Sequence, residues 1–161
     1  MNKAVFLDRD GVINNDTGHY YVYKPADLEI NEGVTEFLKI LQSKGYKLIV
    51  ISNQGGIAKK MYNHEDVEKI HDILKLKLEK EGITLDEIYY CPHHPDSENC
   101  ICRKPDSLMV EKGMARFNVN KKEAFFIGDR ETDIAAAIKA GIKPVKIEPN
   151  EDLMKHIQLF P

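Results

Sequence analysis

The chain has 161 residues, the length of one ordinary domain, and can bury a hydrophobic core. Its formal net charge is -3, and acidic and basic residues are mixed along it, so nothing favours nucleic acid or an anionic membrane as a partner. The first apolar run is too short for a signal peptide, and no run could span a bilayer. We therefore expect a cytoplasmic, monomeric protein with one domain, residues 1–161.

The first apolar run ends in two acids and a glycine, Asp8-Arg9-Asp10-Gly11. A buried strand over Val5–Leu7 would deliver both carboxylates to the edge of a sheet, where the glycine lets the backbone turn. The same residues are also typical of a β-hairpin, because Asp-Gly between apolar runs is a strong hairpin signal. The rest of the chain has to decide between these two interpretations.

Strands and helices are expected to alternate through the rest of the chain. In order, we expect an exposed loop over 14–25, a helix from Asn31 or Glu32 to Gly45, a strand over 47–51, a helix from Asn63 to Gly82, a strand over 85–90, a helix over 108–117, a strand over 124–127, a helix over 134–140 and a strand over 144–147. This alternation predicts the α/β class, a doubly wound parallel sheet with helices on both faces. No insertion is long enough for a large cap domain.

Polar, chemically useful turns follow three of the expected strands. They begin at Asp8, Ser52 and Gly128, and the last contains Asp129 and Asp133. The carboxyl ends of parallel strands share one edge of the sheet, and ligands bind there. A hairpin explains the first turn but not the other two, so we favour a shared site.

Carboxylates gathered at one edge repel each other unless a cation lies among them, and oxygen ligands without histidine suit Mg²⁺. Ser52 and Lys104 would add the hydrogen-bond donors and positive charge that a phosphate group needs. One aspartate could then attack phosphorus while the other protonates the leaving alcohol. We expect the substrate to be a small phosphate ester. As alternatives, Ser52 could cap a turn, Asp133 could cap a helix, and Lys104 could be a surface lysine.

A loop over 91–105 contains all three cysteines, Cys91, Cys100 and Cys102, together with His93 and His94. Three thiolates and one imidazole complete a tetrahedral structural zinc site. The alternative is three reduced core cysteines, but this polar, proline-rich loop has no apolar core to bury them. Spacing alone does not choose between the two histidines.

Four motifs occur in a fixed order: Asp8-x-Asp10-Gly11, Ser52, Lys104, and Gly128-Asp129 with Asp133. In this order they resemble the haloacid dehalogenase-like phosphatases over essentially the whole chain. The resemblance implies that Asp8 is the nucleophile, that Asp10 is the general acid and base, and that Mg²⁺ is held by Asp8, the backbone carbonyl of Asp10, and Asp129.

The same resemblance implies that the phosphate and substrate are bound by Ser52, Asn53, Arg103 and Lys104. Asp133 would contact the residues that bind the metal or the phosphate rather than bind either of them directly. Lys59 and Lys60 follow the second motif and could contact a second phosphate, but a lysine pair before a helix is more often solvated.

The pattern Cys-x-His, loop, Cys-x-Cys-Arg-Lys-Pro resembles a zinc-bearing subgroup of this family, which includes heptose 1,7-bisphosphate phosphatases and histidinol-phosphate phosphatases. It falls on Cys91, His93, Cys100 and Cys102, and the zinc would fasten the loop that carries Arg103. The segments 52–58 and 89–95 and the Gly18-His19-Tyr20 loop resemble the heptose enzymes. The short cysteine loop and the segment 128–134 resemble the histidinol-phosphate enzymes. We favour the heptose bisphosphate as substrate.

Three other classes share part of this pattern. A response-regulator receiver would carry its acceptor aspartate on a middle strand, whereas here the acid pair follows the first. A 3′-phosphatase acting on nucleic-acid ends would need a basic or aromatic groove. A non-catalytic phosphate- or zinc-dependent interaction module would leave the acidic motifs unexplained.

Overall fold

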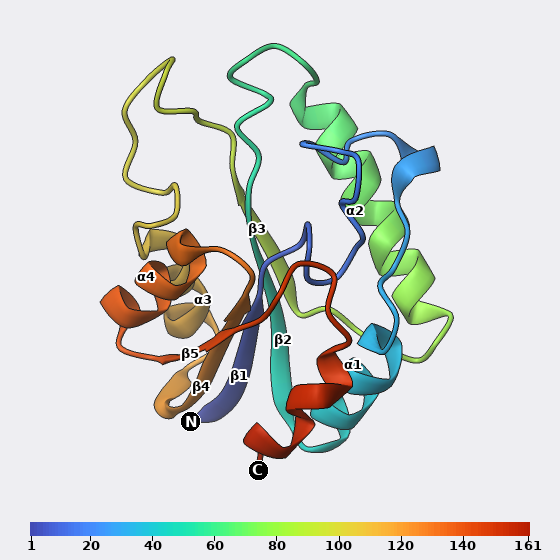
Figure 1. Cartoon of the computed structure of the whole chain (residues 1–161). Helices are drawn as coiled ribbons and strands as arrows, with labels where there is room; N and C mark the ends of the chain where they lie inside the picture. The colour runs from blue at the N-terminus through green and yellow to red at the C-terminus, as the bar shows by residue number, and fades with distance from the viewer.

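The computed structural model describes residues 1–161 and contains one five-stranded parallel sheet with the strand order β3-β2-β1-β4-β5 (Figure 1). The strands are β1 (Asn2–Leu7), β2 (Tyr46–Asn53), β3 (Glu87–Cys91), β4 (Val119–Gly128) and β5 (Lys143–Lys146). The helices are α1 (Val34–Ser43), α2 (His64–Glu79), α3 (Leu108–Arg116) and α4 (Glu131–Ala140), with short 3₁₀ helices η1 (Pro25–Asp27) and η2 (Leu153–Leu159). The predicted α/β fold, a doubly wound parallel sheet without a large cap domain, is confirmed.

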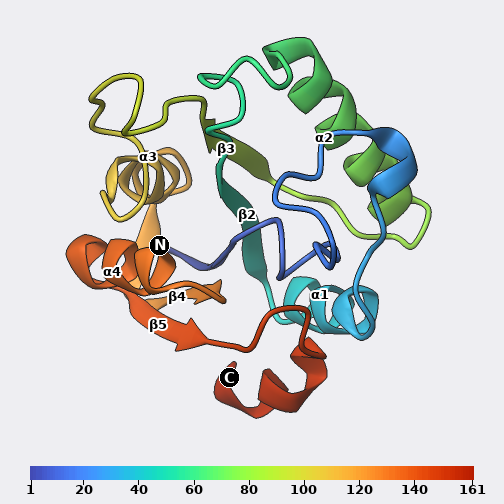
Figure 2. The ribbon, with the colours of Figure 1, turned by 45° about the horizontal axis from the view of Figure 1, so that its top comes forward.

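Helices cover both faces of the sheet, as Figures 1 and 2 show. α1, α2 and η2 pack on one face, and α3 and α4 on the other. Along β1, the side chains of Val5 and Leu7 enter the first of the two cores, while Ala4 and Phe6 enter the second. A strand buried on both faces has no polar side to alternate with, which is why its sequence is a continuous apolar run.

Capping and periodicity place α2 where the sequence predicts it. The Asn63 side chain accepts a hydrogen bond from the backbone N–H of Asp66, and the Asp66 carboxylate accepts one from the backbone N–H of Asn63. This reciprocal capping box satisfies two backbone donors at the helix start. The inward face of the helix carries Val67, Ile70, Leu74 and Leu78.

The hairpin interpretation of the first acidic turn is wrong. β1 pairs in parallel with both β2 and β4, so the chain does not turn back beside β1. Gly11 has a φ of 82°, a left-handed conformation that side chains other than glycine rarely adopt. The turn therefore leads the chain away from the sheet edge and leaves Asp8 and Asp10 there.

β4 and α4 begin several residues earlier than predicted, while the other elements lie close to their predicted ranges. β4 begins at Val119 rather than Ala124, because exposed residues extend the strand beyond its apolar part. α4 begins at Glu131 rather than Ile134, because the Asp133 carboxylate accepts a hydrogen bond from the backbone N–H of Arg130 and so caps the helix. η2, which packs on the α1 face, was not predicted. None of the helices combines the length and apolar character needed to cross a membrane.

Candidate active site

The predicted polar turns meet at the carboxyl edge of the sheet. Asp8 follows β1, Ser52 lies in the last residues of β2, and Asp129 follows β4. A cavity of about 380 Å³ opens at this edge, and half of the 14 residues that line it are charged. The residues that line it are Asp8, Asp10, Tyr20, Tyr21, Asn53, Gly55, Pro95, Arg103, Lys104, Pro105, Arg130, Glu131, Thr132 and Asp133.

Three carboxylates form a compact cluster beside this cavity. Asp8, Asp129 and Asp133 each place an oxygen within 4.8 Å of the others. Burial, together with the charges of Asp133 and Asp129, raises the pKa of Asp8 to about 8, although Lys104 opposes the shift. Burial and Asp133 also raise the pKa of Asp129, and its buried Oδ1 has no hydrogen-bond partner. An orphaned carboxylate oxygen among other acids fits a hard cation such as Mg²⁺.

Gly11 leaves the space that this cluster needs. A Cβ atom at position 11 would lie 2.6 Å from Oδ2 of Asp129, closer than real contacts allow. A side chain here would push Asp129 away from Asp8, in addition to the strain of the positive φ. Gly11 of the first motif therefore allows Asp129 of the fourth motif to lie beside Asp8.

Lys104 is a buried part of the site, so the surface-lysine interpretation is wrong. Its ammonium donates to Oδ1 of Asp8 at 2.9 Å, to Oδ1 of Asp133 at 2.6 Å and to the carbonyl of Ile51 at 2.9 Å. Its backbone is held by Asn53, which accepts from the Lys104 N–H at 3.0 Å and donates to the Lys104 carbonyl at 3.1 Å. The contacts with Asp8, Asp133 and Ile51 fix the position of the ammonium, and the two hydrogen bonds with Asn53 fix the backbone.

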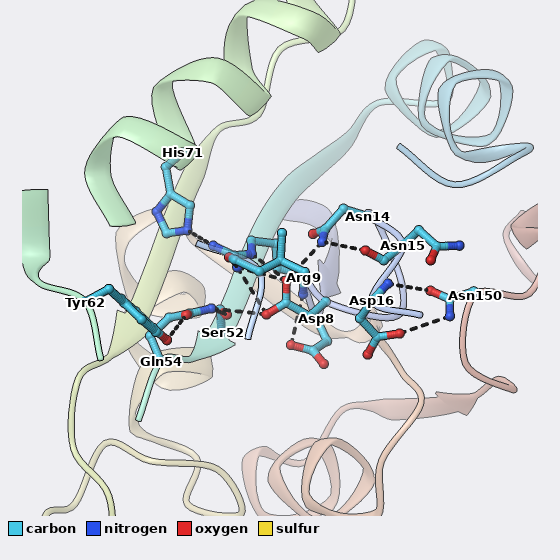
Figure 3. Close-up of polar contacts among 12 residues, drawn as sticks. Asp8, Arg9, Asn14, Asn15, Asp16, Ser52, Gln54, Tyr62, His71 and Asn150 are labelled. Carbon is cyan, nitrogen blue, oxygen red and sulfur yellow. Dashed lines mark hydrogen bonds and ion pairs between the residues drawn. The ribbon is translucent and has the colours of Figure 1, made fainter. Parts of the chain in front are cut away.

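Arg9, between the two aspartates of the first motif, is fully buried and points toward His71 (Figure 3). Its Nε donates to Oδ1 of Asp10 at 2.9 Å and its Nη2 to Oδ2 at 3.1 Å. Its Nη1 lies 3.2 Å from Nε2 of His71 on α2. Burial, with Arg9 and Lys75, lowers the pKa of His71 to about 3, so the imidazole is neutral and accepts this bond. Sequence reasoning missed both Arg9 and His71.

The Ser52 hydroxyl lies behind the cavity rather than on its wall. Its exposed fraction is 1%, and it accepts a hydrogen bond from Nε2 of Gln54 at 2.7 Å. Gln54 also places Nε2 3.4 Å from Oδ2 of Asp10. Because Ser52 is the penultimate residue of β2, the turn-cap interpretation does not describe it.

The cysteine loop brings its three thiols together with one imidazole. The ligand atoms of Cys91, His93, Cys100 and Cys102 lie within 4.8 Å of one another. Sγ of Cys91 is 3.0 Å from Sγ of Cys102, and Nδ1 of His93 is 3.3 Å from the latter. Tetrahedral zinc with bonds of about 2.3 Å places its ligands roughly 3.8 Å apart. The 3.7 Å between Sγ of Cys91 and Sγ of Cys100 matches this spacing and the other two distances are shorter, so the cluster is compatible with zinc. His94 lies outside the cluster and accepts from the backbone N–H of Asp96.

This loop also holds positively charged groups at the cavity. Nη1 of Arg103 donates to the carbonyl of His93 at 3.0 Å, which ties the arginine to the cysteine cluster. Arg130 lines the cavity from the start of α4 and was missed, although it directly follows Asp129 in the sequence. Lys59 and Lys60 are exposed and do not line the cavity.

Comparison with known proteins agrees with this geometry. A model of haloacid dehalogenase-like hydrolases matches residues 2–141. A Helicobacter pylori protein named D-glycero-beta-D-manno-heptose-1,7-bisphosphate 7-phosphatase is 43% identical over 143 residues, which cover 88% of this chain and 81% of that protein. A Campylobacter jejuni protein named D-glycero-alpha-D-manno-heptose-1,7-bisphosphate 7-phosphatase is 41% identical over 140 residues, which cover 87% and 78%.

A crystal structure of D,D-heptose 1,7-bisphosphate phosphatase from B. bronchiseptica, complexed with magnesium and phosphate, matches this fold with a TM-score of 0.85. The two chains are 29% identical, and the match covers 99% of this chain and 88% of the other. With the family model spanning most of the sequence and the four motifs gathered at one sheet edge, the chain belongs to the haloacid dehalogenase-like hydrolases.

Proposed function

We propose that the protein is a Mg²⁺-dependent phosphatase that removes the 7-phosphate of D-glycero-D-manno-heptose 1,7-bisphosphate through a phospho-aspartate intermediate. The observation that carries this proposal is the buried Lys104 ammonium between Asp8 and Asp133, at the base of a polar cavity. It places positive charge beside a carboxylate nucleophile, as phosphoryl transfer requires. The substrate is proposed from the relatives, since the Helicobacter pylori protein with this activity in its name is 43% identical.

In the proposed reaction, a carboxylate oxygen of Asp8 attacks phosphorus and the bond from phosphorus to the sugar oxygen breaks. Asp10 gives its proton to that departing oxygen, then takes a proton from water as the water oxygen attacks the phospho-aspartate. Phosphate leaves and Asp8 is restored. Arg9, which pairs with Asp10 through two hydrogen bonds, holds the acid and base in place.

We assign the magnesium site to Asp8, Asp129 and the backbone carbonyl of Asp10. The bound ion would neutralise charge on the phosphoryl oxygens and the attacking carboxylate. The unpartnered Oδ1 of Asp129 and the raised pKa of Asp8 support this assignment, because the single ammonium of Lys104 contacts Asp8 and Asp133 but does not balance all three carboxylates.

Ser52, Asn53, Arg103 and Lys104 are assigned to phosphate and substrate binding. Lys104 faces the transferred group, and Asn53 holds its backbone. Arg103, together with Arg130, lines the cavity and could pair with the second phosphate of a bisphosphate. Lys59 and Lys60 are not needed for this, because the two arginines already supply the charge.

A structural zinc ion is proposed for Cys91, His93, Cys100 and Cys102, whose ligand atoms gather in one group. This ion would fix the loop 91–105 and, through the bond from Arg103 to the His93 carbonyl, the position of the arginine at the cavity. The metal would position groups that bind substrate without taking part in the chemistry.

The first test is release of inorganic phosphate, with and without Mg²⁺, from both anomers of heptose 1,7-bisphosphate and from histidinol phosphate. We expect Mg²⁺-dependent release with a clear preference for a bisphosphate. The relatives carry both alpha and beta names, so the anomers must be assayed separately. A preference for histidinol phosphate would instead make the protein a histidinol-phosphate phosphatase of histidine biosynthesis. No Mg²⁺-dependent release from any ester would favour a non-catalytic interaction module.

We also propose a cytoplasmic monomer with one domain over 1–161. All three cysteines are free, as expected in a reducing compartment. Large exposed apolar side chains such as Tyr20, Leu76 and Ile138 come from different elements of the fold. Light scattering after gel filtration would contradict the proposal if it gave the mass of a dimer.

A further inference from the structure

Gln54 is a fully buried side chain that the proposed reaction does not yet use. Its Nε2 donates to Oγ of Ser52 at 2.7 Å and lies 3.4 Å from Oδ2 of Asp10. Its Oε1 accepts a hydrogen bond from the hydroxyl of Tyr62 at 2.7 Å. Figure 3 shows Tyr62, Gln54 and Ser52 in a line that leads toward the first acidic turn. The two ends of one amide thus join a tyrosine to two groups of the candidate active site.

The orientation of this amide matters because its two ends have opposite hydrogen-bonding character. If the amide were reversed, its oxygen would face the carboxylate of Asp10 and the Nε2 bonds would be lost. The Tyr62 hydroxyl supplies a donor for Oε1 and so favours the observed orientation. Burial raises the pKa of Tyr62 above its ordinary value, which keeps this donor protonated.

The fold makes a dedicated place for the Tyr62 ring. A Cβ atom at position 56 would lie 2.1 Å from Cε1 of Tyr62, so only glycine admits the ring here. The exposed fraction of Tyr62 is 6%. Its ring stacks on Tyr23 with centroids 4.7 Å apart and meets the edge of Tyr21 at 5.6 Å. Because Tyr21 lines the cavity, Tyr62 connects the loop that carries Tyr21 to the buried side chain of Gln54.

Ser52 benefits directly from this arrangement. Because its oxygen accepts from Gln54, its own proton points elsewhere, so Gln54 fixes the orientation of the Ser52 hydroxyl. Gln54 also limits the rotation of the Asp10 carboxylate from the side opposite Asn14, whose Nδ2 donates to Oδ1 of Asp10 at 3.0 Å. Small displacements of such reacting groups reduce the rate strongly.

We propose that Tyr62 and Gln54 are positioning residues, in which the Tyr62 hydroxyl fixes the Gln54 amide and the amide holds Ser52 and Asp10 in the geometry for phosphoryl transfer. The inference rests on the proposed phosphatase function and deepens it. It assigns a role to a hydroxyl that does not touch the substrate and acts only through Gln54.

The test is Tyr62→Phe, which removes one hydroxyl and keeps the aromatic packing. We expect kcat to fall about three- to tenfold, the range for one hydrogen bond, while KM changes by less than about twofold. The matched control is Tyr46→Phe, because the Tyr46 hydroxyl donates to the carbonyl of Pro161 away from the site. This control should keep the wild-type kcat. A purely structural role for Tyr62 would instead lower thermal stability and leave kcat per folded molecule unchanged.

A double-mutant cycle tests whether Tyr62 acts through Gln54. Gln54→Met should lower kcat at least as much as Tyr62→Phe, and adding Tyr62→Phe to it should cause no further loss. Losses that multiply, a wild-type kcat in Tyr62→Phe, or an effect confined to KM would overturn the inference. Assays with both the heptose bisphosphate and 4-nitrophenyl phosphate keep the two proposals separate. A wild type active only on the second ester would contradict the proposed substrate, while the cycle would still report on Tyr62.

Discussion

The ammonium of Lys104 lies 2.9 Å from Oδ1 of Asp8, and both side chains are almost completely buried. The same ammonium lies 2.6 Å from Asp133, so one positive charge faces two carboxylates, with Asp129 next to them. Buried charges are tolerated only when they are balanced by partners. The cluster therefore carries excess negative charge, which a divalent cation would offset and a phosphate group could then approach.

Asp8→Asn should abolish Mg²⁺-dependent phosphate release and leave the fold intact. The amide cannot form the phospho-aspartate, so we expect kcat to fall by more than about 10⁴-fold. Burial and the charges of Asp133 and Asp129 raise the pKa of Asp8, and asparagine keeps an oxygen that can accept from Lys104, so the substitution should not lower the melting temperature. The control is Asp72→Asn at an exposed position of α2. Undiminished turnover in Asp8→Asn would exclude Asp8 as the nucleophile.

Magnesium alone should stabilise the folded protein. Binding to the native state at about 100 times the dissociation constant adds roughly 2.7 kcal/mol to the free energy of unfolding. We expect a rise in melting temperature with added Mg²⁺, measured by calorimetry without substrate, and a much smaller rise in Asp129→Asn. Asp72→Asn should respond like the wild type. An equal Mg²⁺ response in Asp129→Asn would contradict the assignment of Asp129 as a ligand.

Most of the fold and the acidic part of the site were predictable because their signals are local. A buried strand reads as an apolar run, and the residue after it lies at the sheet edge, which placed Asp8 and Asp129 correctly. Helix caps such as Asn63 also involve residues only a few positions apart. The histidine ligand of the cysteine cluster has no such local signal, because the spacing alone allows either His93 or His94. The path of the loop is what brings His93 to the thiols.

The residues behind the site were not predictable for the same reason. Arg9 and His71 are far apart in the sequence, and neither lies in a local pattern that points to the other. In the sequence, nothing distinguishes Tyr62 from other aromatic residues that pack near the start of a helix. Its hydroxyl reaches Gln54 because Gly56, which has no side chain, lets the Tyr62 ring lie against the backbone. Contacts between distant segments leave no periodic signal, so sequence reasoning found the reacting groups and missed the residues that hold them.

Removing the proposed zinc should loosen the cysteine loop. Cys102→Ser takes away one ligand, so we expect the free energy of unfolding to fall by at least about 2 kcal/mol. KM should rise, because Arg103 is tied to the cluster through the His93 carbonyl. Ser97→Ala, an exposed change in the same loop, is the control. Metal analysis of protein purified without added metals would contradict the four-ligand site if it found no zinc.

His71 should make stability depend on pH. Burial, with Arg9 and Lys75, lowers the pKa of its imidazole to about 3, whereas the ordinary value in the unfolded chain is about 6.5. Between these values the unfolded state binds a proton that the folded state does not, so stability is lost as pH falls below about 6.5. His71→Gln keeps an acceptor for Arg9 but cannot titrate. From about pH 7 to about pH 5, the wild type should lose roughly 2 kcal/mol more than this variant in denaturant unfolding.

The comparison of wild type with His71→Gln isolates this histidine, because every other titrating group is common to both proteins. The raised pKa of Asp8 acts in the opposite direction, since a carboxyl kept neutral by burial favours the folded state at low pH, but it cancels in the difference. His64→Gln, at an exposed position of α2, should keep the wild-type slope. Parallel stability curves for wild type and His71→Gln would mean that folding does not change the pKa of His71, which would contradict an imidazole kept neutral by burial and by Arg9.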